Sequence, residues 1–317
     1  HALGGVVLTV GIDIGGTKIA GGVVDEHGTV IASTRIATPA GVPDIEHAVE
    51  EMVDELRAGH DVAAVGVAAA GFIDSARSTI YFGVNIPWRN EAIRPRLEAR
   101  LGLPVAIEND ANAAGWAEYQ FGAGRGYRDF VMLTIGTGIG GAVVAGGELY
   151  RGGHGVAAEL GHTRHIRDGL PCGCGQRGCI EQYASGRALQ RIANEIADAG
   201  GIGIGLAAAR TQRGRLSGAT ISELVLQDDP GANEALRTVA SAIGETCGQL
   251  TAALDPGVFV IGGGVAQLGE RLRAPIEEAY RAHVPARGFR PVADIAIAEL
   301  ENDAGLIGAA NLARQAS

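Results

Sequence analysis

One pattern of strands and glycine turns occurs twice in the 317-residue sequence, and it limits the folds that the chain can adopt. From Val6 the residues read as strand, glycine turn, strand, turn and strand, because β-branched runs alternate with Gly-rich segments. The same order returns from Phe130, where Thr134–Gly141 corresponds to the earlier turn at Asp13–Lys18. Helices and further strands are expected after each copy. We therefore predict a duplicated α/β fold with two lobes and a central cleft.

The first glycine turn, D-I-G-G-T-K at Asp13–Lys18, has the composition of an anion-binding turn. Gly15 and Gly16 permit a close backbone approach, and Thr17 and Lys18 add a hydroxyl and an ammonium group. The segment differs from a P-loop, which needs G-K-[ST] followed by a helix, because a strand is expected after Lys18. From these residues alone, an ordinary glycine hairpin is the alternative.

The second glycine turn contains G-T-G-I-G-G, which satisfies the dinucleotide-binding pattern G-x-G-x-x-G. That fingerprint has to open a helix, whereas the residues that follow, A-V-V-A-G-G-E-L-Y, read as a hairpin, so we expect no nicotinamide site. A third glycine cluster, Ile261–Val265, follows the predicted helix Asn233–Leu254 and the strand V-F-V-I. Its place at a strand end suits the nucleoside side of the predicted cleft.

Asn109 and Asp110 stand between the predicted strand Pro104–Glu108 and a helix that follows directly. Polar groups at strand ends are the usual location of chemistry in α/β sheets. Asp110 therefore has two interpretations, because it can cap the helix or project from the strand end into the cleft.

Three cysteines, Cys172, Cys174 and Cys179, lie in one glycine-rich segment, and His162 lies just upstream. Zinc takes thiolate and imidazole ligands, and a closed set of three cysteines and one histidine is usually structural. A disulfide and free thiols are the alternatives, because the C-x-C spacing is not the commonest one. With four cysteines in the chain and no signal peptide recognised, a reducing compartment and a zinc site are expected. Cys247, within a helical run, reads as a small buried apolar residue.

Two carboxylates, Glu159 and Glu181, flank the cysteine segment, and a zinc ion would bring them near one another. Carboxylates accept hydrogen bonds from hydroxyl groups, and a zinc-bound His162 keeps one ring nitrogen as a donor. The arrangement would suit a polyhydroxylated ligand. The alternative for each glutamate is a solvated surface charge.

Composition narrows the classes of partner. The net charge of −10 argues against nucleic acid, because phosphate backbones require a cationic face, although small phosphates remain compatible. No apolar stretch reaches the roughly 20 residues of a membrane span. We expect a cytoplasmic enzyme with no membrane partner.

Taken together, the motifs resemble the ROK family (repressors, open reading frames, kinases), and most closely its bacterial glucokinases. They are D-I-G-G-T-K, A-G-F-I-D, N-I-P-W, E-N-D-A-N-A-A, I-G-T-G-I-G-G, E-L-G-H, C-G-C-G-x-x-G-C-I-E, I-G-G-G-V and A-G-L-I-G-A-A. The resemblance implies an actin-like, ribonuclease-H-like ATPase fold. Its lobes would be residues 6–121, joined by a last helix at about 303–316, and residues 122–302, with a zinc-binding loop at 162–179. It also implies phosphorylation of a hexose, glucose first, by ATP with Mg2+, and a homodimer or dimer of dimers.

The resemblance further implies a role for individual residues. Asp110 would be the general base. The sugar contacts would be Gly71, Asn85, Asn109, Asp110, Glu159, His162 and Glu181. The phosphate turns would include Asp13, Gly15, Gly16, Thr17, Lys18, Thr137 and Gly138, and the adenosine contacts would be Gly262, Gly263, Gly264 and Val265. The ligands of a structural Zn2+ would be His162, Cys172, Cys174 and Cys179.

Three alternatives stay open on the sequence. A kinase for mannose or an N-acetylhexosamine would share all of these motifs, and polyphosphate is an alternative donor. A non-catalytic, sugar-responsive regulator is the alternative from another class; the family's repressors carry a DNA-binding domain ahead of the first glycine turn. We expect no such domain, because the opening strand is predicted to start near Val6. One departure from the family is visible, since Ala70 precedes Gly71 where many of its kinases have proline.

Overall fold

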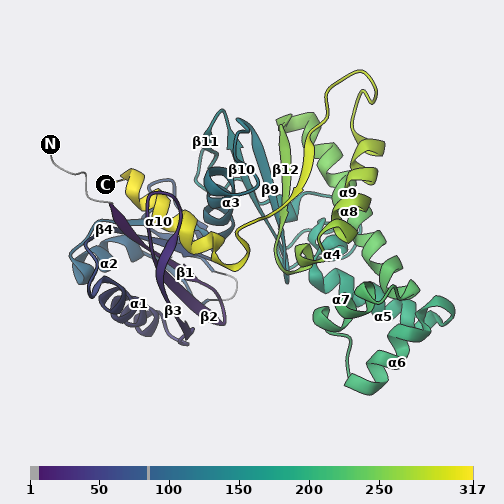
Figure 1. The fold of residues 1–317 in the computed structure, drawn as a ribbon, viewed down its shortest axis with the longest axis horizontal. Coiled ribbons are helices and arrows are strands. Elements are labelled where there is room, and N and C mark those ends of the chain that lie inside the picture. The colour runs from purple at the N-terminus through teal and green to yellow at the C-terminus, as the bar shows by residue number, and fades with distance from the viewer. Residues whose placement is uncertain (1–6, 84–85, 317) are drawn as a thin grey trace. The chain divides into compact units, whose positions relative to one another are not determined.

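The computed structural model describes residues 7–83 and 86–316, and it confirms the predicted α/β class (Figure 1). The strands of the described residues are β1 (Leu8–Ile14), β2 (Lys18–Val24), β3 (Val30–Ala37), β4 (Val62–Ala69), β5 (Phe72–Ile73), β6 (Ile80–Phe82), β7 (Arg89–Glu91), β8 (Val105–Asn109), β9 (Phe130–Ile135), β10 (Ile139–Ala145), β11 (Glu148–Leu149), β12 (Val258–Gly262) and β13 (Asp294–Ile297). The helices are α1 (Val42–Arg57), α2 (Ile93–Leu101), α3 (Asp110–Phe121), α4 (Glu181–Ala184), α5 (Gly186–Ala199), α6 (Ile204–Arg213), α7 (Gly218–Leu226), α8 (Pro230–Leu254), α9 (Glu270–His283) and α10 (Ala304–Ala316). Short 3-10 helices add η1 (Leu160–His162), η2 (Gly201–Gly203), η3 (Gly264–Leu268) and η4 (Glu301–Asp303).

The chain divides into two compact units. Unit 1 comprises His1–Gly126, Ala142–Ala158 and Glu299–Ser317, and unit 2 comprises Tyr127–Gly141 and Glu159–Ala298. The lobe limits expected from the sequence, 6–121 with about 303–316 and 122–302, stay a prediction.

Two sheets repeat one strand order, as the duplicated sequence pattern predicts. The first sheet runs β3-β2-β1-β4-β8, and the second runs β11-β10-β9-β12-β13. In the first sheet, β1 pairs antiparallel with β2 and parallel with β4, which pairs parallel with β8. In the second, β12 pairs parallel with both β9 and β13. Each copy is thus a hairpin extended by parallel strands, and a small third sheet, β5-β6-β7, belongs to unit 1.

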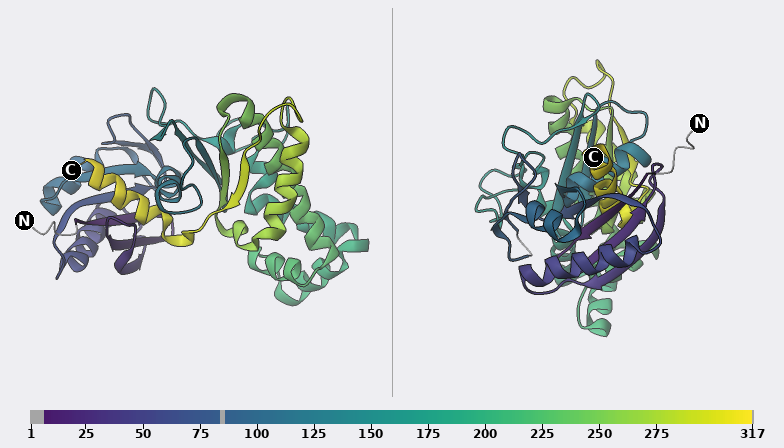
Figure 2. Two further views of the ribbon diagram at one scale, coloured as in Figure 1. Left: turned by 45° about the horizontal axis from the view of Figure 1, so that its top comes forward. Right: turned by 90° about the vertical axis from the view of Figure 1, so that its left-hand side faces the viewer.

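The first sheet is covered by α1 on one face and by α10 on the other (Figures 1 and 2). Two glycines of the β1–β2 hairpin lie on opposite faces of the sheet. A side chain at Gly21 would meet Met52 and Leu56 of α1. A side chain at Gly11 would overlap the carbonyl of Leu306 in α10. The helix backbone therefore touches the strand backbone directly. Glycine permits this close approach because it has no Cβ.

Unit 2 places its longest helix of the described residues, α8, against α9, α5 and α7. Gly244 and Gly248 of α8 face backbone atoms of Ile276 and His283, so these two helices also pack closely. Cys247 of α8 is fully buried, as the sequence predicted. Within the described part of the chain, no helix has the length and hydrophobicity needed to cross a membrane.

A buried carboxylate, Glu118 of α3, joins two distant segments of unit 1. Its Oε2 accepts hydrogen bonds from the backbone N–H groups of Ala123 (3.0 Å) and Glu299 (3.1 Å), and Oε1 accepts one from Leu300 (2.7 Å). Glu118 has no exposed surface. An ionised carboxylate only accepts hydrogen bonds, so it satisfies three backbone donors that would otherwise be buried without partners.

We predict that Glu118→Gln lowers the free energy of unfolding by about 1.5–3 kcal/mol, because the amide NH2 group replaces one acceptor and faces backbone donors. The measurement is a denaturant titration followed by circular dichroism. Glu299→Gln is the control, since the Glu299 side chain is exposed and pairs with Arg125 at 3.5 Å. Its cost should stay below about 0.5 kcal/mol. Equal costs for both variants would contradict the role assigned to Glu118.

Candidate functional site

Asn109 and Asp110 lie where β8 ends and α3 begins, as the sequence predicts. The Asn109 side chain is held at both ends, because Oδ1 accepts from the backbone N–H of Asn112 (3.0 Å) and Nδ2 donates to the carbonyl of Gly71 (3.1 Å). Asn109 is therefore the helix cap, and the interpretation of Asp110 as the cap is wrong. Asp110 occupies the first helical position, and Gly71, Asn109 and Asp110 come together in unit 1.

The register of the parallel strands explains why Asp13 belongs to the same group. Asp13 of β1 pairs with Ala68 of β4, which pairs with Glu108 of β8. The carboxyl ends of parallel strands meet at one edge of a sheet, so Asp13 and Asp110 emerge at the same edge.

The environment of these two carboxyl groups disfavours their charged forms. Burial raises the pKa of Asp110, and the backbone N–H of Ala111, which donates to Oδ1 (2.9 Å), opposes that shift. Burial and then the charge of Asp110 raise the pKa of Asp13 to about 7, while Lys18 opposes the shift. Two interacting carboxyl groups with raised pKa values are typical of a functional site.

The first glycine turn keeps some of its backbone groups for itself. The N–H of Gly15 donates to the carbonyl of Lys18 (3.0 Å), and the carbonyl of Gly15 accepts from the hydroxyl of Thr38 (2.6 Å). Gly16, Thr17 and Lys18 are exposed. The atoms available to a phosphate group are therefore those of the exposed tip, and the Gly15 N–H group is engaged inside the turn.

The second glycine turn, in unit 2, is bound to Glu181. The N–H of Gly136 donates to the carbonyl of Gly138 (3.0 Å), which closes a turn one residue shorter than the first one. Glu181 Oε2 accepts from the N–H of Ile139 (3.0 Å), and it occupies the space that a Cβ at Gly138 would need. Glu181 was expected from the resemblance to contact a sugar. The geometry adds a contact with the turn that holds Thr137 and Gly138.

The third glycine cluster lies beside this turn. β12 ends at Gly262, and Gly263 has a φ of 86°, a left-handed conformation that favours glycine. A side chain at Gly263 would also clash with the backbone of Ile135 at the end of β9. The N–H of Gly186 donates to the carbonyl of Gly136 (2.8 Å), and the side chain of Val265 lies near Gly186. The segments that we expect to contact phosphate and adenosine in unit 2 are therefore neighbours.

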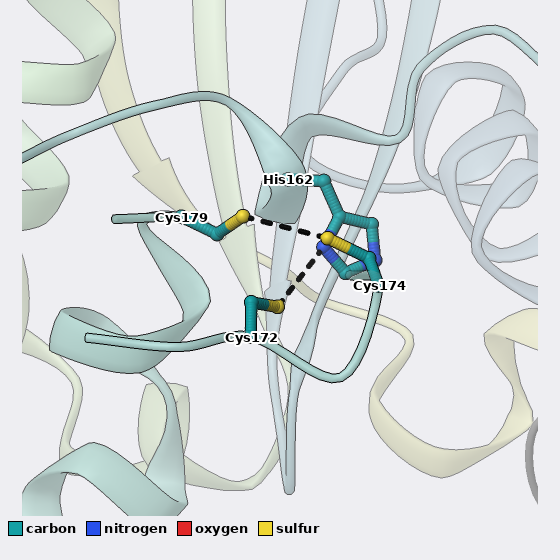
Figure 3. Close-up of side chains that lie close together, drawn as sticks. All are labelled: His162, Cys172, Cys174 and Cys179. Atoms are coloured by element: carbon teal, nitrogen blue, oxygen red, sulfur yellow. Dashed lines mark hydrogen bonds between the residues drawn. The ribbon is translucent and has the colours of Figure 1, made fainter. Parts of the chain in front are cut away.

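His162, Cys172, Cys174 and Cys179 point toward one another (Figure 3). One ligand atom from each lies within 4.8 Å of all the others. Cys172 Sγ lies 3.6 Å from His162 Nδ1, and Cys174 Sγ lies 3.6 Å from Cys179 Sγ. A disulfide would need a sulfur separation of about 2.05 Å, whereas a tetrahedral ion with zinc–ligand bonds of about 2.0–2.3 Å gives edges of about 3.6 Å. The donor set fits a tetrahedral thiophilic cation.

Ionisation of the Cys179 thiol is disfavoured when no cation is present. Burial, and then the adjacent sulfurs of Cys174 and Cys172, raise the pKa of Cys179 to about 12. Several thiolates cannot share so small a volume without a compensating positive charge. A dication bound among them favours the deprotonated forms.

Two predicted residues need separate mention. Asn85 lies outside the described residues. Glu159 directly precedes the 3-10 turn η1, and its carbonyl accepts from the N–H of His162 (3.0 Å), so it lies next to the metal-ligand cluster.

Sequence reasoning assigned no role to Glu108. A charged residue at the end of the apolar strand V-A-I-E was the available signal.

Residues 9–316 match the ROK family. The chain belongs to this family. The glucokinase of Streptomyces coelicolor is 46% identical over 310 residues, which cover 97% of this chain and 98% of that protein. An N-acetylmannosamine kinase of Yersinia pseudotuberculosis is 32% identical over 305 residues, which cover 96% of this chain and 97% of that protein. The crystal structure of a ROK family glucokinase from Streptomyces griseus in complex with glucose and AMPPNP matches with a TM-score of 0.88 and 46% identity, covering 97% of this chain and 99% of that chain.

The raised pKa of Asp13 makes a prediction about stability. Because folding favours the protonated carboxyl, the wild type loses stability as the pH rises from about 4, the ordinary value, to about 7. Asparagine does not titrate. We therefore expect the melting temperature of Asp13→Asn, relative to that of the wild type, to increase between pH 5 and pH 8. Thermal scans without nucleotide or divalent cations measure this difference, and a difference independent of pH would contradict the assignment.

Proposed function

We propose that this chain transfers the terminal phosphoryl group of ATP to the 6-hydroxyl group of glucose. The observation that carries the proposal is the half-buried carboxyl of Asp110 beside Asn109, whose amide is fixed in orientation at a strand end. Support for the substrates comes from the glucokinase of Streptomyces coelicolor and from the related structure that contains glucose and AMPPNP.

Asp110 acts as the general base in this proposal. Its ionised carboxylate accepts the proton of the 6-hydroxyl group while the bond between O6 and the γ-phosphorus forms. The bond from that phosphorus to the β–γ bridging oxygen breaks, and ADP leaves with this oxygen. The raised pKa brings the base closer to neutral pH, where proton transfer is most efficient. Asp13 offers the oxygen donors that Mg2+ prefers, and Mg2+ supplies charge neutralisation on the phosphates when it is bound.

We assign the other contacts by unit. In unit 1, Gly71 and Asn109 contact the sugar, and the exposed tip Gly16–Lys18 contacts phosphate. In unit 2, Glu159, His162 and Glu181 contact sugar hydroxyls, Thr137 and Gly138 contact phosphate, and Gly262–Val265 contacts adenosine. Glu181 accepts a hydrogen bond from the second glycine turn. This contact supports the assignment of neighbouring sugar and phosphate contacts in unit 2.

We also propose that His162, Cys172, Cys174 and Cys179 bind a structural Zn2+. A closed set of four protein ligands leaves no open position for substrate. With Nδ1 turned toward the sulfurs, Nε2 of His162 remains as the donor to a sugar hydroxyl. A homodimer is the assembly that we propose.

The first experiment is a coupled assay of ADP formation with ATP and Mg2+ across glucose, mannose, N-acetylglucosamine and N-acetylmannosamine. The highest kcat/KM with glucose is the expected result. A preference for an amino sugar would leave the proposed mechanism unchanged and alter only the substrate. N-acetylmannosamine is tested because an N-acetylmannosamine kinase is among the relatives. Turnover with polyphosphate in place of ATP would change the donor. No turnover with either donor would overturn the proposal.

We predict that Asp110→Asn lowers kcat by about 100- to 10,000-fold, because the amide cannot accept the proton. Glucose binding should be retained, since asparagine has nearly the same shape. Kinetics give the first quantity, and isothermal titration calorimetry with glucose gives the second. Near-normal turnover would exclude Asp110 as the base, and loss of glucose binding as well would show a structural defect.

For the metal cluster, we expect about one zinc ion per chain in the wild type and almost none in Cys174→Ser, because three remaining ligands bind zinc far more weakly. Glucose affinity should fall with the metal, since His162 belongs to both sites. Elemental analysis after gel filtration measures the zinc. Cys247→Ala is the control, because that cysteine is buried in α8 outside the cluster. Full zinc occupancy in Cys174→Ser would refute the ligand assignment.

A further inference from the structure

Glu108 is a buried charge immediately before Asn109 and Asp110, and it has four partners in unit 1. Only 4% of its surface is exposed. Oε1 accepts from the backbone N–H of Asn109 (3.0 Å) and from Nδ2 of Asn112 (3.2 Å). Oε2 accepts from Nε of Arg151 (2.7 Å) and lies 3.6 Å from Nη1 of Arg77.

The two oxygens have different tasks. Oε1 binds the peptide N–H of Asn109 and the side chain of Asn112, so it holds the last residue of β8 and the first turn of α3 in one geometry. The same turn contains Asp110. Because Asn109 also caps this turn through Asn112, a shift of the Glu108 carboxylate would disturb both the cap and the orientation of the Asn109 amide.

Oε2 fixes the position of the carboxylate itself. Arg151 follows β11, and Arg77 lies in the turn between β5 and β6, with a φ of 51°. Burial and then the charge of Arg151 lower the pKa of Arg77, while Glu108 opposes that shift. The carboxylate therefore keeps two partly buried arginines together. The arginines in turn stabilise the carboxylate where it lies, since a buried charge without its partner is strongly destabilising.

We propose that Glu108 is a positioning residue for phosphoryl transfer: through the Asn109 N–H group and Asn112 it sets the orientation of the sugar-binding amide and of the base Asp110. The inference rests on the proposed kinase activity. It also assigns Arg151 and Arg77 as the residues that hold Glu108 in place. A misplacement of reacting groups by about 1 Å costs on the order of 100-fold in rate, so the effect on catalysis should exceed what a loss of stability explains.

The test is Glu108→Gln, in which the side chain keeps its shape but presents an NH2 group to Arg151 or to Asn109. We expect kcat to fall about 10- to 100-fold and the KM for glucose to rise, while the KM for ATP and the zinc content stay unchanged. Adding Arg151→Met should restore part of kcat, because it removes the nearer of the two cations opposite the glutamine amide, leaving Arg77 at 3.6 Å, and the amide carbonyl can then face Asn109.

Glu46→Gln is the matched control. Glu46 lies on α1 of the same unit, is 5% exposed, and is held by Arg96 (2.8 Å from Nε) and Arg100 (3.6 Å). Both substitutions neutralise a buried carboxylate between two arginines. Both should lower the melting temperature, but only Glu108→Gln should lower kcat when the two variants are assayed at a temperature at which each is fully folded.

The outcomes separate the two hypotheses. A wild type without hexose kinase activity would overturn the proposed function. An active wild type with equal kcat in Glu108→Gln and Glu46→Gln would overturn the role of Glu108 alone. If Glu108→Gln cannot be obtained folded, Arg151→Met alone is the test variant, because it removes one partner of the Glu108 carboxylate and leaves the carboxylate in place. A lower kcat with a raised KM for glucose in Arg151→Met would support the inference. Unchanged kinetics would overturn it.

Discussion

The direct contact between the backbone of α10 and the backbones of its neighbours is the constraint on which unit 1 depends. Side chains at Gly11 of β1 and Gly66 of β4 would overlap carbonyl groups of α10, and one at Gly308 of α10 would overlap the carbonyl of Ala113 in α3. Three elements, β1, β4 and α3, therefore meet α10 with no side chain between them and its backbone. This contact explains the small residues of A-G-L-I-G-A-A, because larger ones would force the last helix off the sheet.

The close packing determines where the residues proposed for catalysis lie. With α10 seated on β1 and β4, and α3 seated on α10, the ends of β1 and β8 and the start of α3 are fixed relative to one another within unit 1. Asp13, Asn109 and Asp110 occupy those positions. Their partial burial, which raises the pKa values of both aspartates, is thus a consequence of the same packing that holds the fold together.

The sequence predicted what depends on local patterns. The strand–turn–strand repeats, the convergence of three cysteines with His162, and the position of Asn109 and Asp110 at a strand end all follow from residues close together in the chain. The sequence places Gly15 in a phosphate turn, but it does not reveal that the N–H group of Gly15 donates to the carbonyl of Lys18. Glu108 was missed for a different reason: its partner Arg151 lies 43 residues away, and only the folded structure brings the two together.

Both ends of α3 are held by buried carboxylates, and this arrangement suits a helix that carries the proposed base. Glu108 binds the backbone before the first turn, and Glu118 binds the segments beyond the last turn. Between them, the indole N–H of Trp116 donates to Asn311 of α10 (2.8 Å). A helix fixed at its two ends and along its side cannot rotate about its axis, so Asp110 keeps one orientation without help from substrate. Preorganisation of this kind lowers the reorganisation needed at the moment of proton transfer. The buried carboxylates of Glu108 and Glu118 are thus placed at the two ends of the helix that begins with Asp110, where they restrict its movement.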